Sequence, residues 1–60
     1  MKEKTRREMI KTLRVIRGAL SELDFDLKAA HSDREVMMAM DDIIAGVGRM
    51  KDTYKQGEAV

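Results

Sequence analysis

The sequence contains no cysteine, proline or tryptophan, and only one tyrosine and one phenylalanine among its 60 residues. Without cysteine there are no disulfides, thiolate metal ligands or thiol nucleophile, which excludes the small, disulfide-stapled secreted proteins. The longest apolar run covers only residues 36–40, whereas a membrane-spanning helix needs ~20 apolar residues. The first ten residues carry charge but lack the apolar region of a signal peptide. We therefore expect a cytoplasmic protein that does not contact membranes.

The residues that are present favour helix along the whole chain, because Ala, Leu, Met, Glu, Lys and Arg are abundant and β-branched residues are few. Two series of apolar residues advance by alternating steps of three and four, the spacing of a coiled-coil seam. The first series is Met9, Leu13, Ile16, Leu20, Leu23, Leu27 and Ala30, and the second is Val36, Met40, Ile43, Val47, Met50 and Tyr54. The six-residue step between the two series breaks the phase, which predicts two helices.

The connection between the two helices carries its own signal. Ser32, followed three residues later by Glu35, is a capping-box pattern, so the second helix is predicted to begin at Asp33. A connection this short places the two helices antiparallel and side by side. The predicted fold class is all-α: one helical-hairpin domain over residues 1–60, with a first helix at about 3–29, a turn at 30–32, a second helix at about 33–55 and a frayed tail at 56–60.

A single hairpin of this length struggles to bury enough apolar surface to offset the conformational entropy lost on folding. Each predicted helix also carries more apolar residues than one narrow seam hides. We therefore expect a homodimer, in which two hairpins form an antiparallel four-helix bundle. The residues predicted to bind a protein partner or a second copy are Met9, Leu13, Ile16, Leu20, Met37, Met38, Met40 and Ile44.

Methionine and glycine add two features to the second helix. Met37, Met38 and Met40 form a cluster of flexible, polarizable side chains that suits either core filling in a dimer or an adaptable protein-binding face. Gly46 and Gly48 each cost ~1 kcal/mol of helix propensity relative to alanine, which indicates that a neighbouring helix approaches closely.

Charge is unevenly distributed along the chain although the net charge is only +1. Residues 1–20 hold seven basic and two acidic groups, residues 21–42 hold two basic and seven acidic, and residues 43–60 hold three basic and two acidic. Folding into a hairpin therefore creates a basic end, where the termini meet, and an acidic turn. Antiparallel packing of two hairpins places opposite charges side by side, which predicts that orientation.

One line along the first helix carries basic residues and no acidic residue: Lys4, Arg7, Lys11, Arg14, Gly18, Ser21, Phe25 and Lys28, of which Gly18 and Ser21 are only small spacers. Such a stripe suits a phosphate backbone, with Phe25 available to stack on an unpaired base. Lysine and arginine on a solvated helix face explain the same pattern. We favour that explanation, because the net charge is small and one aromatic ring is a poor stacking platform.

In helix length and hairpin topology the chain resembles the plasmid-encoded Rop family across most of its length, although no sequence motif is shared. The resemblance implies an antiparallel four-helix bundle of two hairpins. It also implies binding of paired RNA loops through the first helix, with the basic stripe as the contact surface.

No set of nucleophile, base and orienting group is available, because the sequence has one histidine, His31, and no cysteine, and Ser21 and Ser32 both have structural explanations. No calcium-loop spacing occurs among the acidic residues near the turn. We therefore expect no enzyme activity, no cofactor and no metal site. The predicted function is that of a small regulator or adaptor that binds protein through its helix surfaces, of a kind common in phages and mobile elements. Nucleic-acid binding and a structural role in a larger complex are the alternatives.

Overall fold

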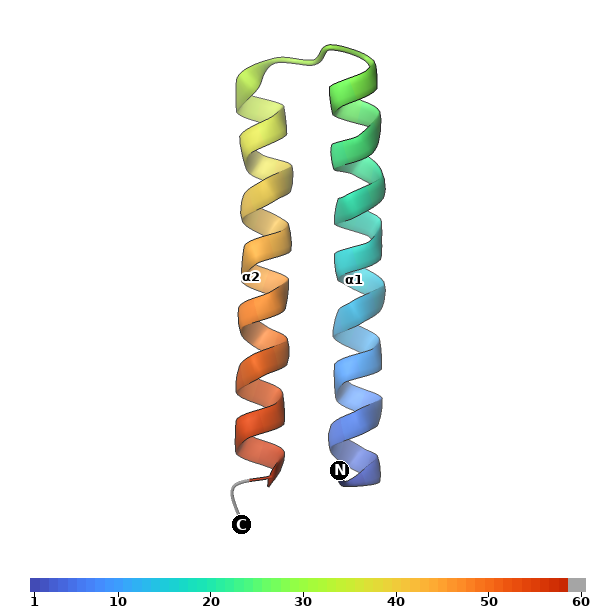
Figure 1. The fold of residues 1–60 in the computed structure, drawn as a ribbon, viewed down its shortest axis with the longest axis vertical. Coiled ribbons are helices and arrows are strands. Elements are labelled where there is room, and N and C mark those ends of the chain that lie inside the picture. Colours follow the sequence, from blue (N-terminus) through green and yellow to red (C-terminus); the bar gives the residue numbers. More distant parts are fainter. Residues whose placement is uncertain (59–60) are drawn as a thin grey trace.

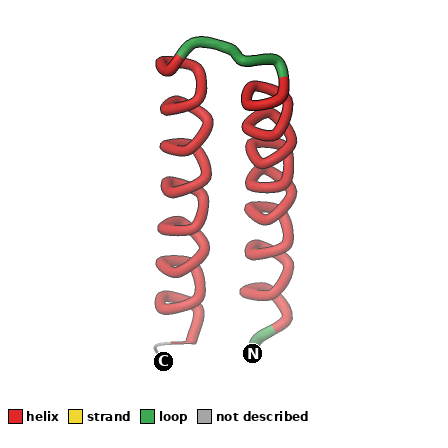
Figure 2. Tube along the Cα trace, turned by 45° about the horizontal axis from the view of Figure 1, so that its top comes forward, coloured by secondary structure: helices red, strands yellow, loops and turns green. Residues whose placement is uncertain are grey.

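The structure is a computed structural model that describes residues 1–58, and it consists of two antiparallel helices joined by one short turn (Figure 1). Helix α1 spans Glu3–Lys28 and α2 spans Asp33–Glu58, each with 26 residues. Together they form a rod of 46 × 14 × 9 Å. The tilted view in Figure 2 shows the helices side by side over their whole length, with the turn at one end and both termini at the other. The predicted all-α helical hairpin is confirmed.

The end of α1 has the hydrogen bonds of a Schellman motif. The His31 N–H donates to the Asp26 carbonyl at 2.9 Å, and the Ala30 N–H donates to the Leu27 carbonyl at 3.3 Å. A Schellman motif requires a residue in the left-handed conformation directly after the C-cap. Ala30 is that residue, with φ of 55°. The first helix therefore ends at Lys28, one residue before the predicted end, because Ala29 already serves as its C-cap.

The start of α2 at Asp33 is the one that the capping-box pattern predicts. The Ser32 hydroxyl accepts from the Glu35 N–H at 3.4 Å, and the Ser32 carbonyl accepts from the Val36 N–H at 3.2 Å. The reciprocal half of the box does not form within residues 1–58, because the Glu35 carboxylate lies 3.3 Å from His31 Nδ1 instead.

At the open end of the hairpin, α2 continues to Glu58, three residues beyond the predicted helix end at 55. The prediction of a frayed tail is wrong for residues 56–58, while residues 59–60 lie outside the described part. Tertiary contact explains the extension. Gly57 lies directly against Thr5, and Glu58 Oε1 accepts from the Lys2 N–H at 2.8 Å. A carboxylate at this place also interacts favourably with the positive end of the α1 dipole.

The two helices touch along one line of residues, which we call the contact seam. Every residue of the contact seam is buried or half-buried, and small and large residues alternate along it. Gly46 has the tightest fit, since a Cβ built there would lie 2.6 Å from Ile16 Cγ1. Small residues at every seventh position let the two backbones approach closely. The contact seam is made of Thr5, Met9, Thr12, Ile16, Ala19, Leu23 and Asp26 on α1, and Val36, Ala39, Ile43, Gly46, Met50, Thr53 and Gly57 on α2.

About half of the residues predicted for the seam lie in the contact seam, and the prediction is wrong for the others. Met9, Ile16 and Leu23 on α1 face α2, as predicted, and so do Val36, Ile43 and Met50 on α2. Ala30 lies in the turn and the remaining predicted members lie beside the seam, and Thr5, Thr12 and Ala19 take their place against α2. The helices meet along this neighbouring line because its residues are small. The predicted close approach occurs at Gly46, whereas Gly48 faces open space.

Neither helix combines the length and the apolar character needed to cross a lipid bilayer.

Candidate protein-interaction surface

The apolar residues displaced from the contact seam form a continuous apolar face along one side of the rod. They recur at every seventh position on both helices, so they share one side of the hairpin. Leu20 is 49% exposed, Leu27 61%, Val47 45% and Tyr54 46%. Such exposure is high for residues that follow a coiled-coil repeat, which normally faces another helix. We define the apolar face as Leu13, Leu20 and Leu27 on α1 with Met40, Val47 and Tyr54 on α2.

A hollow of about 410 Å³ lies within the apolar face near the open end of the hairpin. Leu13 and Ile16 of α1 and Val47 and Tyr54 of α2 contribute to its walls. Lys51 and Lys55 are the charged residues of this lining, and they lie on the outer edge of α2. The hollow is therefore suited to apolar side chains of an approaching helix, with lysine ammonium groups along one border.

The predicted protein-binding residues divide between two sides of the rod. Met9, Leu13 and Ile16 line the hollow, and Leu20 and Met40 continue the apolar face towards the turn. Met37 and Ile44 flank this face and are 54% and 69% exposed. Met38 lies on the opposite side, in a hollow with Glu22, Asp26, Glu35, Ala39 and Asp42. The methionine cluster of the sequence is thus not one surface.

The side opposite the apolar face is polar. Its central hollow, of about 450 Å³, lies over the small residues Gly18, Ala19, Ala45 and Gly46. Glu22, Asp42 and Arg49 border this hollow, and Val15 is its exposed apolar member. The two sides of the rod therefore differ: the heptad series of large apolar residues lies on one side, whereas the other side carries Val15 and Met38 among polar groups.

The predicted nucleic-acid stripe is exposed along α1, but flanking acids neutralise part of it. Arg7 Nε lies 3.2 Å from Glu3 Oε1, and Lys28 Nζ lies 3.1 Å from Asp24 Oδ2. Both are i,i+4 pairs, the spacing at which helical side chains meet. Acidic residues on the flanks of the stripe therefore pair with Arg7 and Lys28. Within residues 1–58, the stripe residues Lys4, Lys11 and Arg14 have no ion-pair partner.

Arg6, beside the stripe, forms the shortest ion pair at this end, with its Nη2 2.6 Å from Glu3 Oε1. The hydrogen bond from Arg6 is the main cause that lowers the pKa of the Glu3 carboxyl below its ordinary value, and Arg7 adds a smaller contribution. The same contact raises the pKa of Arg6. All three side chains are exposed, so the pair orders the first turn of α1 without forming a buried site.

The turn gathers Asp26, His31 and Glu35. His31 Nδ1 lies 2.9 Å from Asp26 Oδ1 and 3.3 Å from Glu35 Oε2. The Phe25 ring meets the His31 ring edge to face at 5.2 Å while remaining 61% exposed. One potential metal-ligand atom of each of the three residues lies within 4.8 Å of the others. Because His31 already joins the two carboxylates, the cluster is explained as a clamp between α1, the turn and α2, and we assign no metal to it.

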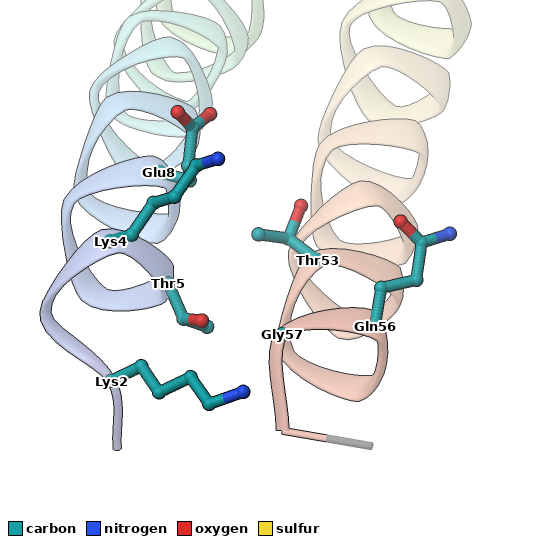
Figure 3. Close-up of a pocket in the computed structure, with 7 residues that line it drawn as sticks. All are labelled: Lys2, Lys4, Thr5, Glu8, Thr53, Gln56 and Gly57. Atoms are coloured by element: carbon teal, nitrogen blue, oxygen red, sulfur yellow. The ribbon is translucent and has the colours of Figure 1, made fainter. Parts of the chain in front are cut away.

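A further hollow of about 460 Å³ lies at the open end of the hairpin. Figure 3 shows Thr5 and Thr53 projecting into the gap between the helices and Lys2 reaching across its lower edge. Lys4 and Glu8 lie along the α1 side, and Gln56 and Gly57 along the α2 side. Its side chains are polar and mixed in charge, so they do not converge on one ligand chemistry.

The fold converts the charge pattern of the sequence into a dipolar rod. Cut at mid-height, the half with the open end contains residues 1–15 and 46–58, with nine basic and four acidic groups and a net charge of +5. The half with the turn contains residues 16–45, with three basic and seven acidic groups and a net charge of −4. A surface partner therefore meets a strong gradient of potential along the apolar face.

Comparison with protein-family models, with curated proteins and with solved structures finds no match for this chain.

Sequence reasoning missed the small-residue half of the contact seam. The signal was present as a second repeat of seven, Thr5, Thr12 and Ala19 on α1 with Ala39, Gly46 and Thr53 on α2. Two repeats side by side, one large and apolar and one small, indicate that each helix has two different neighbours. The small repeat faces the other arm of the hairpin, and the exposed large one defines the apolar face.

Proposed function

We propose that this chain is a non-enzymatic regulator or adaptor that acts by binding protein through its apolar face. The observation that carries this proposal is the exposure of large apolar residues at heptad spacing on both helices, Leu20 and Leu27 on α1 and Val47 and Tyr54 on α2. Contiguous apolar surface of this kind is characteristic of protein-interaction sites in small proteins. Its i, i+7 spacing suits helices as the bound elements.

The architecture that follows from this proposal is a four-helix bundle, completed by two further helices laid on the apolar face. In such a bundle the apolar face and the large members of the contact seam share one core. The small seam residues then allow close approach within each hairpin, and the apolar face supplies the contact between hairpins.

The test compares Leu20→Lys with a matched variant, Val15→Lys, in the middle of the same helix but on the polar side. Burying one leucine contributes about 2 kcal/mol, so Leu20→Lys should weaken protein binding by at least about 30-fold. Val15→Lys should leave it unchanged. Sedimentation gives the mass of the complex, and tagged chain recovered from its host gives its companions. A stably folded 6.9 kDa species with no companion would refute the proposal.

Nucleic-acid binding through the stripe is the competing function. It is supported by Lys4, Lys11 and Arg14, and weakened by the two ion pairs at the ends of the stripe. Reversing the charge at Arg7, Lys11 and Arg14 distinguishes the two functions. RNA or DNA binding that falls steeply with salt, and that the triple variant loses, would favour the nucleic-acid function. No detectable binding at low salt by the parent chain would remove it.

A role as a structural subunit differs from the adaptor role in stoichiometry. A companion recovered in a fixed ratio and at high abundance indicates a subunit, whereas a substoichiometric target indicates a regulator.

A further inference from the structure

We propose that the occupant of the apolar face is a second copy of this chain, laid antiparallel on the first about a two-fold axis that crosses the rod at mid-height. This inference rests on the proposed function and names the partner and its orientation. Four observations support it: the self-complementary pattern of the face, the surface left exposed, the charge gradient, and the level at which the two helices are in register.

The apolar face is self-complementary in size and spacing. Both helices present one large apolar side chain per seven residues, from Leu13 to Leu27 on α1 and from Met40 to Tyr54 on α2. A two-fold axis across the rod at mid-height places α1 over α1 and α2 over α2 in opposite directions. Leu13 then lies level with Leu20 of the second copy, Met40 with its Tyr54, and Val47 with its own counterpart, while Leu27 lies towards the charged start of the second α1. All neighbouring helices in the resulting bundle are antiparallel, as in the hairpin itself.

The exposed area fits one dimer interface. The chain exposes 4818 Å² of surface. A compact protein of 6.9 kDa exposes about 4,000 Å², so the hairpin carries an excess of about 800 Å². Each partner in a standard protein interface loses about 800 Å². One further copy therefore covers the surplus.

Charge selects between the two orientations that a two-fold axis allows. In the antiparallel arrangement, the +5 half of one copy lies beside the −4 half of the other, at both ends of the bundle. In the parallel arrangement, +5 meets +5 and −4 meets −4. Exposed ion pairs add little affinity individually, but the repulsion of like halves is repeated at both ends and therefore opposes parallel packing.

The register within the hairpin fixes the level of the axis. Ile16 lies beside Gly46, and Thr5 lies beside Gly57, so α1 and α2 have their midpoints at the same height. Ile44, at the edge of the apolar face, stands close to this height and is 69% exposed. In the antiparallel dimer, Ile44 therefore lies near its own counterpart across the axis. Ala29 lies at the turn, so in the antiparallel dimer the two copies of Ala29 lie at opposite ends of the bundle.

Single spin labels test the arrangement cleanly, because the chain contains no cysteine of its own. Ala29→Cys lies about 13 residues from mid-height, so at ~1.5 Å per residue its two labels should be about 40 Å apart in the antiparallel dimer. Ile44→Cys labels should lie within about 20 Å of each other. Both variants are measured by double electron–electron resonance, with sedimentation confirming the dimer mass of each labelled protein.

The outcomes separate this inference from the proposed function. A long Ala29 distance together with a short Ile44 distance supports the antiparallel dimer. Short distances at both positions overturn the orientation while leaving protein binding in place. A monomer whose labels show no mutual distance, but whose capture of another protein depends on Leu20, overturns the second copy as occupant and retains the proposed function.

Sodium chloride gives an independent readout of the orientation. Raising it from about 0.05 to 0.5 M screens the charges, so an antiparallel dimer should weaken by at least about threefold. A parallel dimer should tighten, because the same salt screens repulsion between like halves. Dissociation constants from sedimentation at the two concentrations show the sign, and a tightening would overturn the inference.

Discussion

Ala30 has a strained backbone conformation that the hydrogen bonds at the end of α1 require. Its φ of 55° lies in the left-handed region, yet the two Schellman hydrogen bonds that end α1 depend on it. Alanine pays a steric penalty in this region that glycine does not. Natural helices accordingly favour glycine at this position, and its absence here removed the sequence signal that marks the helix end.

Replacing Ala30 by glycine should therefore raise the free energy of unfolding. Relief of the left-handed penalty, less the greater freedom of glycine in the unfolded chain, amounts to about 0.5–1 kcal/mol. The midpoint of thermal unfolding by circular dichroism should rise by about 4–8 °C. Ala29→Gly is the matched control, since φ at Ala29 is −84° and no strain is relieved there. An equal rise in both variants would contradict this explanation.

Glu3 supplies a prediction about pH at the same scale. The Arg6 hydrogen bond lowers the pKa of the folded Glu3 carboxyl, so the associated stability is present above the unfolded pKa and is lost as pH falls through the folded value. An NMR titration should show Glu3 protonating at lower pH than an ordinary glutamate. Arg6→Gln should move this pKa back towards its ordinary value, and Arg7→Gln should move it less. A larger effect from Arg7→Gln would reverse the assignment.

At the scale of the helix, the glycines of α2 have opposite roles. Gly46 lies against Ile16 in the contact seam, whereas Gly48 has nothing within 4 Å of where its Cβ would be. Gly48→Ala should therefore stabilise the protein by about 1 kcal/mol through helix propensity alone. Gly46→Leu should destabilise it by about 2 kcal/mol, because the larger side chain separates the helices or displaces Ile16.

Chemical denaturation of both glycine variants, followed by circular dichroism, measures these changes. Gly18→Ala serves as a second control, because Gly18 also faces open space. Tolerance of leucine at Gly46, with stability equal to that of the parent chain, would show that the helices do not approach as closely as the contact seam requires.

The sequence predicts the elements of this fold better than their mutual contact. The phase break between the apolar series and the Ser32–Glu35 pattern place two helices and the start of the second correctly, since both signals are local. The end of α2 depends on Gly57 lying against Thr5, a contact between distant parts of the chain that no local pattern records. The apolar face was not predicted as a separate surface for the same reason. Periodicity identifies the apolar positions of α1 but does not say which of them contact α2.

The candidate site was therefore predicted in part. The heptad series of the sequence contains Leu13, Leu20 and Met40, which lie on the apolar face. It includes them because residues of the contact seam and residues of the apolar face both recur every seven residues. The sequence predicts Met38 on the outer line of the second helix, although it places Met38 among the protein-binding residues together with Met37 and Met40. On a helix, adjacent residues point about 100° apart, and Met38 lies on the polar side.

At the scale of the whole molecule, exposed apolar surface couples folding to association. If two copies fold together, mass action makes the thermal midpoint depend on protein concentration. We expect a rise of about 5 °C for each tenfold increase in concentration, given an unfolding entropy for 120 residues of two chains. Leu20→Lys should melt at lower temperature and with a midpoint independent of concentration. A concentration-independent midpoint in the parent chain would contradict coupled folding.

The start of α1 and the end of α2 lie beside one another, with Glu58 accepting from the Lys2 N–H, and this has a practical consequence. A donor dye on one terminus and an acceptor on the other are held close while the hairpin is closed. Unfolding of the turn into one continuous helix would separate them by about 80 Å at ~1.5 Å per residue. Energy transfer within a single chain thus reports hairpin closure separately from every encounter with another molecule.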